Sequence, residues 1–305
     1  MNWQEELAAE LKTFLRPEQY LLNAPMSEHT TFKIGGAADV LIFPSTTADV
    51  ISIFKLTNER GLNCTILGNG SNVLVLDGGI RGVVMKFNGE FSTIKREGRR
   101  LIAGAGAKLK DVSNFAAENG LTGLEFAVGI PGSIGGAVFM NAGAYGGEMK
   151  NVVSVVRAVS RDGRLLELRG NELDLGYRRS VFQSNGHAIC EVELELEDGD
   201  VDQIKSSMED FTQRRQSKQP LEYPSAGSTF KRPKGHFAGT LIDQTGLKGL
   251  RIGGAMVSEK HAGFVVNAGG ATASDVLKLI DEVKRRVYEA YGVKLSPEVR
   301  IIGEE

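Results

Sequence analysis

Glycine is the residue whose placement most constrains this chain. It accounts for 38 of the 305 residues and concentrates at residues 68–82, 129–147 and 235–270. Average glycine usage is about 7 per cent, and the sequence has neither a collagen period nor a low-complexity tract. Backbone amides approach a phosphate closely only where no Cβ intervenes. These clusters therefore indicate either tight turns or phosphate-binding loops.

Two of the clusters have the form of phosphate-binding loops. The first is Gly68-Asn69-Gly70-Ser71-Asn72, between predicted extended segments at 63–67 and 73–76, and the second begins at Pro131-Gly132-Ser133-Ile134-Gly135-Gly136. Neither the GxGxxG nor the GxxxxGK[ST] spacing occurs, so a Rossmann site and a P-loop are both unsupported. Either cluster alone fits tight turns equally well, but two of them beside helices and strands favour a ligand.

Hydrophobic periodicity predicts a mixed α+β chain. We expect helices at 3–15, 47–60, 108–119 and 201–216, and strands at 38–43, 152–160, 164–169 and 188–197. The strongest helix is predicted to begin at a Ser274 cap and to end at Gly292. Its apolar stripe consists of Val276, Leu279, Ile280, Val283, Val287 and Tyr291.

The charge balance excludes polyanion binding as the main role. Lys and Arg total 36 against 38 Asp and Glu, a net charge of −2 that gives no field to attract nucleic acid or an anionic membrane. No stretch approaches 18 uncharged apolar residues, and the acidic N-terminus does not resemble a signal peptide. We therefore expect a cytoplasmic protein with no nucleic-acid or membrane partner.

Cysteine and histidine point to structural roles. Cys64 and Cys190 stand among apolar residues, which predicts small buried side chains in a reducing compartment. The histidines do not form a metal-ligand spacing with the cysteines, so we predict no metal site. His236 and His261 are expected to be hydrogen-bonded loop residues.

Taken together, five motifs in the same order resemble the UDP-N-acetylenolpyruvoylglucosamine reductase family. The resemblance extends from Thr30 to Glu305 and matches the shorter form of the family, which lacks an extra tyrosine loop. Arg232 stands where the longer form carries an amide side chain. The motifs are Ile66–Asn72, Pro131–Gly136 with Asn141–Gly146, Tyr177-Arg178, Ala226–Lys231 and Glu298-Val299-Arg300.

The resemblance implies an α+β fold with an FAD-binding lobe of the p-cresol methylhydroxylase type and a smaller α+β substrate-binding lobe. The acidic turn at 197–200 suggests the boundary. We predict an N-terminal helical segment at 1–32, an FAD-binding domain at 33–197, and a substrate-binding domain with a C-terminal catalytic strand at 198–305.

The implied activity is the NADPH-dependent, FAD-mediated reduction of the enolpyruvyl ether of UDP-N-acetylglucosamine to UDP-N-acetylmuramate. This is a step of peptidoglycan synthesis, and so of cell-wall biogenesis and division. Two alternatives are a flavin oxidase of the same fold with another substrate, and a non-catalytic nucleotide-sugar binding protein.

The reaction requires a proton donor near one alkene carbon and cations near the carboxylate. By resemblance, Ser228 donates the proton, Arg178 binds the enolpyruvyl carboxylate, and Glu298 orients Arg178 or shares a proton with the enolate. By spacing alone, Ser228 is a turn serine, Glu298 an exposed strand residue, and Arg178 is indistinguishable from Arg179.

The remaining site predictions also rest on the resemblance. Tyr177, Lys218, Lys231 and Arg300 are expected to bind substrate. The residues expected to bind the cofactor are Gly68, Asn69, Gly70, Ser71, Asn72, Pro131, Gly132, Ser133, Gly135, Gly136, Asn141, Gly143, Ala144 and Tyr145.

Overall fold

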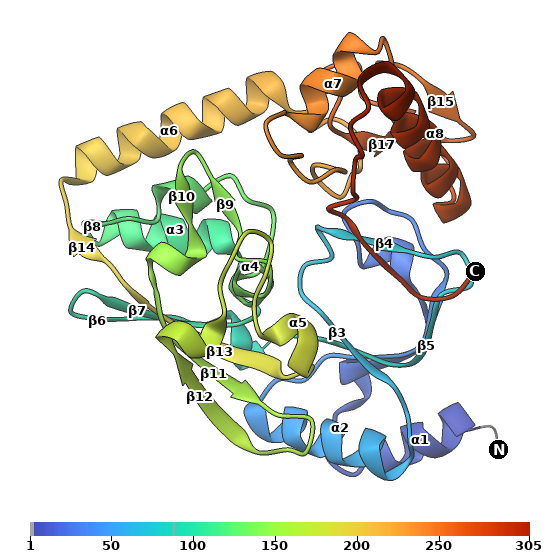
Figure 1. The fold of residues 1–305 in the computed structure, drawn as a ribbon. Helices are drawn as coiled ribbons and strands as arrows, with labels where there is room; N and C mark the ends of the chain where they lie inside the picture. The colour runs from blue at the N-terminus through green and yellow to red at the C-terminus, as the bar shows by residue number, and fades with distance from the viewer. Residues whose placement is uncertain (1–2, 88) are drawn as a thin grey trace. The chain divides into compact units, whose positions relative to one another are not determined.

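The computed structural model describes residues 3–87 and 89–305, in which the chain forms two compact units (Figure 1). The first unit runs to Leu22, from Val40 to Asn69 and from Gly82 to Arg214. The second runs from Asn23 to Asp39, from Gly70 to Arg81 and from Arg215 to Glu305. Both mix helices with strands, in agreement with the predicted α+β class.

The units are interleaved in sequence, whereas we predicted contiguous parts at 1–32, 33–197 and 198–305. Strand β4 (Val73–Val75) pairs in parallel with β18 (Arg300–Ile302) at the end of the chain, which places residues 70–81 in the second unit. The Thr31 hydroxyl also donates a hydrogen bond of 2.7 Å to the Ser225 carbonyl. Such long-range contacts are not encoded in local patterns, so a contiguous division could not anticipate them.

A four-stranded sheet has the strand order β1-β2-β5-β3. Strands β3 and β5 are parallel, with Cys64 opposite Val83 and Leu67 opposite Lys86. The carboxyl ends of these two strands therefore lie side by side. The bounds are β1 (Tyr20–Pro25), β2 (Ala37–Ile42), β3 (Cys64–Leu67) and β5 (Ile80–Lys86).

Helices α1 (Trp3–Leu11) and α2 (Thr47–Glu59) share a hydrophobic core with this sheet. The predicted ends of α2 are confirmed, because the Thr46 hydroxyl caps its start and Gly61, with φ of +63°, follows its end. The predicted helix 3–15 ends earlier, at Leu11. There the Thr13 hydroxyl donates to the Glu10 carbonyl at 2.7 Å, a local bond that competes with helix continuation.

The first unit also contains an antiparallel five-stranded sheet of order β12-β11-β13-β7-β6. The predicted strands 152–160, 164–169 and 188–197 agree with three of its strands to within two residues, whereas its strands at 94–97 and 100–104 were not predicted. The last predicted strand ends at Glu195 because residues 197–198 pair elsewhere. The bounds are β6 (Ile94–Glu97), β7 (Arg100–Gly104), β11 (Val153–Val159), β12 (Leu165–Arg169) and β13 (Ala188–Glu195).

A β-bulge at Cys190 explains the apolar spacing of β13. Glu191 lies opposite Arg157 but Ile189 lies opposite Ala158, so one residue is skipped. Ile189 and Val192 consequently face the same core, while the buried Cys190 joins the core of α1 and α2. The Cys190 carbonyl accepts a hydrogen bond of 2.8 Å from the Ala105 amide.

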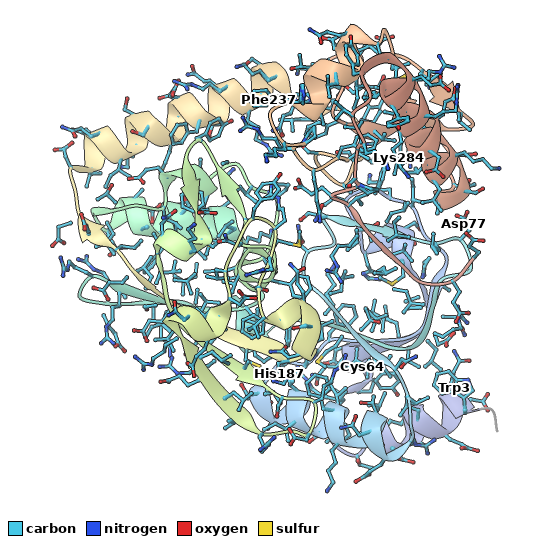
Figure 2. All side chains as sticks on the ribbon, in the orientation of Figure 1. Trp3, Cys64, Asp77, His187, Phe237 and Lys284 are labelled. Carbon is cyan, nitrogen blue, oxygen red and sulfur yellow. The ribbon has the colours of Figure 1, made fainter. Side chains whose placement is uncertain are left out.

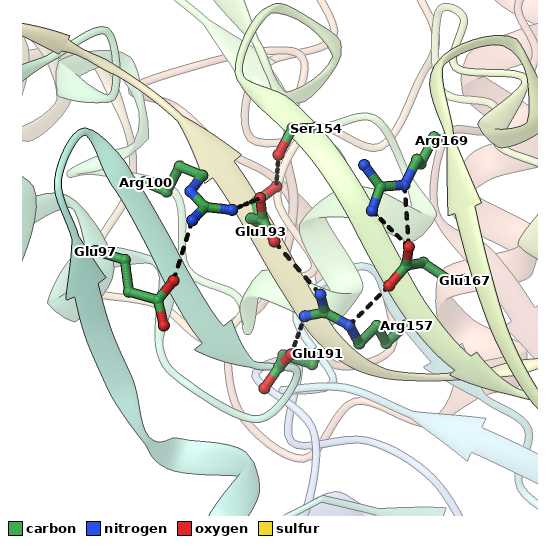
Figure 3. Close-up of polar contacts among 8 residues, drawn as sticks. All are labelled: Glu97, Arg100, Ser154, Arg157, Glu167, Arg169, Glu191 and Glu193. Atoms are coloured by element: carbon green, nitrogen blue, oxygen red, sulfur yellow. Dashed lines mark hydrogen bonds and ion pairs between the residues drawn. The ribbon is translucent and has the colours of Figure 1, made fainter.

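The opposite face of this sheet carries a network of ion pairs (Figure 3). The Glu193 side chain is only 7% exposed and lies 3.2 Å from Arg100 and 3.5 Å from Arg157. Arg157 also contacts Glu167 at 3.1 Å. Because these side chains belong to β7, β11, β12 and β13, the network supports the register of four adjacent strands.

The helices at 109–118, 134–139 and 182–185 contribute buried residues to the core of the five-stranded sheet (Figure 1). Ile204 and Met208 of the long helix α6 pack on Ala117 and Val128. The predicted helices 108–119 and 201–216 are confirmed as α3 and α6 with ends shifted by one or two residues. The bounds are α3 (Leu109–Glu118), α4 (Ile134–Phe139), α5 (Phe182–Asn185) and α6 (Val201–Lys218).

Short elements complete the description. The two-residue strands form the pairs β8 (Leu121–Thr122) with β14 (Glu197–Asp198), and β9 (Gly143–Ala144) with β10 (Gly147–Glu148). The 3₁₀ helices are Pro17–Gln19, Met26–Glu28, Gly89–Ser92, Glu125–Ala127, Met149–Asn151 and Gly170–Leu173. None of the helices in residues 3–87 and 89–305 has the length and hydropathy to cross a bilayer.

The second unit is built around one hydrophobic core that includes Phe32, Leu74 and the buried face of its longest helix. Three strands form an antiparallel sheet of order β15-β16-β17. The bounds are β15 (Arg251–Ile252), β16 (Ala255–Val257), β17 (Val265–Asn267), α7 (Ala238–Gln244) and α8 (Ala273–Tyr291).

The start of α8 corrects the predicted cap. Thr272, not Ser274, is the N-cap, and its hydroxyl accepts a hydrogen bond of 3.1 Å from the Asp275 amide. Ser274 instead donates its backbone amide to Asp77, which also accepts from the Ala273 amide at 2.8 Å. Figure 2 labels Asp77, whose carboxylate thus serves two amides at this helix start.

The apolar stripe of α8 is confirmed except at its end. The five residues from Val276 to Val287 are buried, but Tyr291 is 43% exposed. Gly292 ends the helix with φ of +67°, as predicted. Tyr291 lies in the last turn, beyond the core that buries the rest of the stripe.

Replacing Thr272 by Ala is expected to lower the stability of the protein by about 1 kcal/mol, because an N-cap acceptor is lost. The matched change Ser274→Ala should alter it by less than about 0.5 kcal/mol. Urea denaturation of the full-length variants measures both. A larger loss in Ser274→Ala than in Thr272→Ala would contradict the assignment.

Candidate functional site

The first glycine loop starts where β3 ends. A Cβ on Gly68 would lie 2.8 Å from the Ser133 hydroxyl oxygen, closer than real side chains approach. Gly70, Ser71 and Asn72 belong to the second unit. Gly70 has φ of +68°, and a Cβ there would lie 2.5 Å from the His29 carbonyl oxygen. Glycine is therefore required at position 70, where the obstacle is backbone, whereas a side chain at position 68 would displace the Ser133 hydroxyl.

The second glycine loop is fixed by backbone hydrogen bonds to residues 105–109. The Gly135 amide donates to the Ala105 carbonyl at 2.9 Å, and the Ile134 amide to the Ala107 carbonyl at 2.9 Å. A Cβ on Gly135 would lie 2.8 Å from the Ala105 Cβ. The Ser133 hydroxyl caps α4 by accepting from the Gly136 amide at 3.3 Å. This loop can pass so close to its neighbour only because residue 135 has no side chain.

The two loops meet at a small pocket in the first unit. Its lining residues are Gly68, Asn69, Lys86, Phe87, Gly106, Lys108 and Ser133. Glycine backbone, the Asn69 amide, the Ser133 hydroxyl and two ammonium groups suit a phosphate group. The pocket thus joins the predicted residues Gly68, Asn69 and Ser133.

Sequence analysis did not single out Lys86 and Lys108. Lys86 is placed here by its register opposite Leu67, and Lys108 by its backbone bridge to Ser133. Burial lowers the pKa of the Lys86 ammonium group. The only local signal was that Lys108 is the first residue of the predicted helix 108–119. No local signal pointed to Lys86, because strand register depends on tertiary structure.

Residues 141–147, which continue the second glycine loop, contact other parts of the chain. The buried Asn141 side chain donates to Glu148 at 2.9 Å and to the Gly176 carbonyl at 3.0 Å. Tyr145, with φ of +51°, stacks on Phe211 of α6 at 4.5 Å and donates its hydroxyl to the Phe211 carbonyl. Gly143 and Ala144 form β9. In this structure Asn141 and Tyr145 therefore position the loop itself.

A tight turn presents Tyr177 and Arg178. Gly176 and Arg179 exchange two backbone hydrogen bonds of 3.0 Å across it. Arg178 has φ of +53°, a strained left-handed conformation for a non-glycine residue, and its guanidinium lies 5.6 Å from the Tyr177 ring centroid. The neighbouring Arg179 instead pairs with Asp174. The structure therefore separates two arginines that composition could not.

In the second unit, the segment after Ser228 lies beside the segment that contains Glu298. The Glu298 amide donates to the Thr229 carbonyl at 2.8 Å, and the Lys231 amide to the Ser296 carbonyl at 2.9 Å. The Thr229 hydroxyl accepts from the Val265 amide, which holds the segment against β17. Glu298 is only 9% exposed, so its default interpretation as an exposed strand residue was wrong.

Asn72 of the first glycine loop lies beside the segment that contains Glu298. Its side-chain amide donates to the Glu298 carbonyl at 3.4 Å, and its carbonyl accepts from the Arg300 amide at 3.0 Å. Burial lowers the pKa of the Arg300 guanidinium. The second unit thus brings together Asn72, Glu298, Arg300 and the Ser228 segment.

The other predicted positions lie at the surface. Lys218 at the end of α6 and Lys231 are exposed, as is Pro131. His261 accepts a hydrogen bond of 3.1 Å from the Gly263 amide, in agreement with its prediction as a hydrogen-bonded loop residue. Within the part of the chain that the structure describes, no three His, Cys, Asp or Glu side chains are grouped to hold a metal ion.

Comparisons with known proteins match both parts of the chain. A family model described as an FAD binding domain matches residues 38–169, and one described as the C-terminal domain of UDP-N-acetylenolpyruvoylglucosamine reductase matches residues 219–302. A curated UDP-N-acetylenolpyruvoylglucosamine reductase from Clostridium perfringens (strain SM101 / Type A) is 53% identical over the whole of both chains.

Solved structures agree with these matches. The reductase of that name from Thermus caldophilus has a TM-score of 0.80 at 38% identity, covering 92% of this chain and 97% of that one. Phl p 4, a grass pollen allergen with glucose dehydrogenase activity, has a TM-score of 0.51 at 13% identity, covering 64% of this chain and 44% of that one. The latter likeness concerns the fold alone. The predicted FAD-binding lobe of the p-cresol methylhydroxylase type is confirmed.

Replacing Gly135 by Ala is expected to weaken FAD binding at least about tenfold, because the new methyl group would displace the loop from Ala105. Gly176→Ala is the matched control, at a glycine outside the predicted cofactor-binding residues. A Cβ there would lie 3.6 Å from the Arg179 Nε, an ordinary contact, so affinity should change less than about threefold. Fluorescence titration with FAD measures both, and equal affinities would contradict the steric argument.

Proposed function

The chain belongs to the UDP-N-acetylenolpyruvoylglucosamine reductase family, and we propose that Arg178, Ser228 and Glu298 carry out the reaction of that family. The predicted function is confirmed at the level of the enzyme. The protein is an FAD-dependent oxidoreductase that reduces the enolpyruvyl ether of UDP-N-acetylglucosamine to UDP-N-acetylmuramate in peptidoglycan synthesis, with NADPH as hydride donor. The 53% identity to a curated reductase over the full length of both chains favours this activity over that of a flavin oxidase or a nucleotide-sugar binding protein.

The chain's own residues must supply what the cofactor cannot. Bound FAD supplies hydride transfer. The protein then has to bind the substrate carboxylate, stabilise the negative charge that develops next to it, and deliver a proton to the neighbouring carbon.

Arg178 is proposed to bind the enolpyruvyl carboxylate. A guanidinium can make two parallel hydrogen bonds to a carboxylate, which fixes its orientation as well as its charge. The left-handed backbone of Arg178 supports a functional role, since such strain persists where the surrounding structure enforces it. Arg178 is chosen over Arg179 because it follows Tyr177 in the Tyr-Arg motif and has this backbone conformation, whereas Arg179 forms a surface ion pair with Asp174.

Ser228 is proposed as the proton donor, and Glu298 as the group that orients Arg178 or shares a proton with the enolate. The observation that carries this proposal is the backbone pairing of residues 229–231 with residues 296–298. It fixes the turn that contains Ser228 beside the segment that contains Glu298, a residue that is only 9% exposed. A serine hydroxyl is a poor acid in water, so the role of Ser228 requires a nearby cation whose field stabilises the deprotonated oxygen.

Substrate binding completes the proposal. Tyr177, Lys218, Lys231 and Arg300 are proposed to contact UDP-N-acetylglucosamine enolpyruvate, whose phosphates and carboxylate attract cations. The net charge of −2 supports small-molecule substrates and argues against a nucleic-acid or membrane partner. We propose a cytoplasmic location because Cys64 and Cys190 are both free and buried, as is typical of proteins in a reducing compartment.

Replacing Ser228 by Ala should leave the reduction of FAD by NADPH intact but slow turnover of the enol ether about a hundredfold or more, because the proton donor is lost. Stopped-flow absorbance separates the two half-reactions. Ser225→Ala, three residues earlier in the same segment, should retain wild-type turnover. Unchanged turnover in Ser228→Ala would show that another group delivers the proton.

Replacing Arg178 by Lys should lower kcat/KM for the enolpyruvyl sugar nucleotide about tenfold or more, since a bidentate contact becomes a single point charge. Arg179→Lys should stay within about twofold, because a surface ion pair with Asp174 contributes little. Steady-state kinetics decide between them. A larger loss of kcat/KM in Arg179→Lys than in Arg178→Lys would assign carboxylate binding to Arg179 instead.

A further inference from the structure

Lys86 and Lys108 reach the pocket from two different elements, one beside each glycine loop. Lys86 is the last residue of β5 and lies opposite Leu67, the residue directly before Gly68. Lys108 directly precedes α3 and forms a backbone bridge with Ser133. Each loop is therefore accompanied by one lysine, although the two lysines are 22 positions apart in the sequence.

The charge of the pocket favours an anion. Among its seven lining residues, the two lysines are the charged ones, and the rest are glycine, Asn69, Phe87 and Ser133. The half-buried Lys86 loses hydration, which disfavours its charged form and lowers its pKa. An anionic group in the pocket would offset that loss by direct attraction.

FAD, NADPH and the sugar nucleotide all carry a diphosphate, so the ligand chemistry alone does not choose among them. The location of the pocket in the chain favours FAD. All seven lining residues lie within residues 38–169, the part matched by the FAD binding domain model. Glycine loops with backbone amides supply hydrogen bonds to phosphate oxygens but no full positive charge. The two lysines would supply it.

We propose that Lys86 and Lys108 bind the diphosphate of FAD, one beside each glycine loop, and that they make the enzyme selective for FAD over flavins without a diphosphate. This assignment rests on the FAD-dependent activity described above. It adds side-chain cations to a site otherwise lined by glycine backbone and uncharged side chains.

The test compares flavins that differ at the diphosphate. Full-length wild type, Lys86→Gln, Lys108→Gln and the double variant are stripped of flavin and titrated with FAD and with riboflavin by fluorescence. Each single change should weaken FAD binding about tenfold and the double change about a hundredfold, as expected for lost charge-assisted hydrogen bonds. Riboflavin affinity should stay within about twofold.

Two further variants serve as controls. Lys110→Gln removes an exposed lysine of α3 that does not line the pocket, and it should bind FAD as wild type does. Lys86→Arg keeps the charge at the half-buried position and should retain most of the affinity. If Lys86→Gln does not fold, Lys108→Gln, at an exposed position, gives the same comparison.

Three results would overturn the proposal. FAD affinity could be unchanged in the double variant, riboflavin affinity could fall in parallel, or KM for NADPH or the sugar nucleotide could rise while FAD affinity stays constant. The last result would assign the pocket to another diphosphate. Failure of the enzyme assignment itself looks different, because the wild-type protein would then bind no FAD at all.

Discussion

The hydrogen bond from the Ala105 amide to the Cys190 carbonyl, 2.8 Å long, sets the position of the second glycine loop. The carbonyl is available because the β-bulge removes Cys190 from the register of the sheet. The Ala105 carbonyl in turn accepts from the Gly135 amide, at a distance that leaves no room for a Cβ. The position of Ser133 beside Gly68, and with it the pocket, depends on this series of contacts.

The second unit depends on a comparable long-range pairing. Parallel pairing of β4 with β18 places the last strand of the chain beside residues that follow the first glycine loop. Asn72 then contacts the backbone on both sides of Val299, while residues 229–231 pair with residues 296–298. The proposed proton donor and the buried carboxylate therefore share one backbone framework, which keeps side chains from distant parts of the sequence in a fixed relation.

Local rules predicted the regular elements well where local physics dominates. Gly61, Gly120 and Gly292 end helices with left-handed backbones, as expected for residues without a Cβ. The prediction of Ser274 as a cap was wrong, because the adjacent Thr272 forms a capping box with Asp275 while Asp77, from a remote segment, takes the Ser274 amide. The exposure of Tyr291 likewise reflects where the core ends, which periodicity does not show.

The sequence by itself determined the glycine loops, the α+β class and, through its motifs, the FAD-dependent reductase family. Those features reside in short segments, where residue type dictates backbone freedom and periodicity dictates burial. Only the tertiary structure paired Arg179 with Asp174, buried Glu298, interleaved the two units and brought Lys86 and Lys108 to the glycine loops. The last three of these features depend on strand register and long-range pairing, which are set by contacts between residues far apart in the chain.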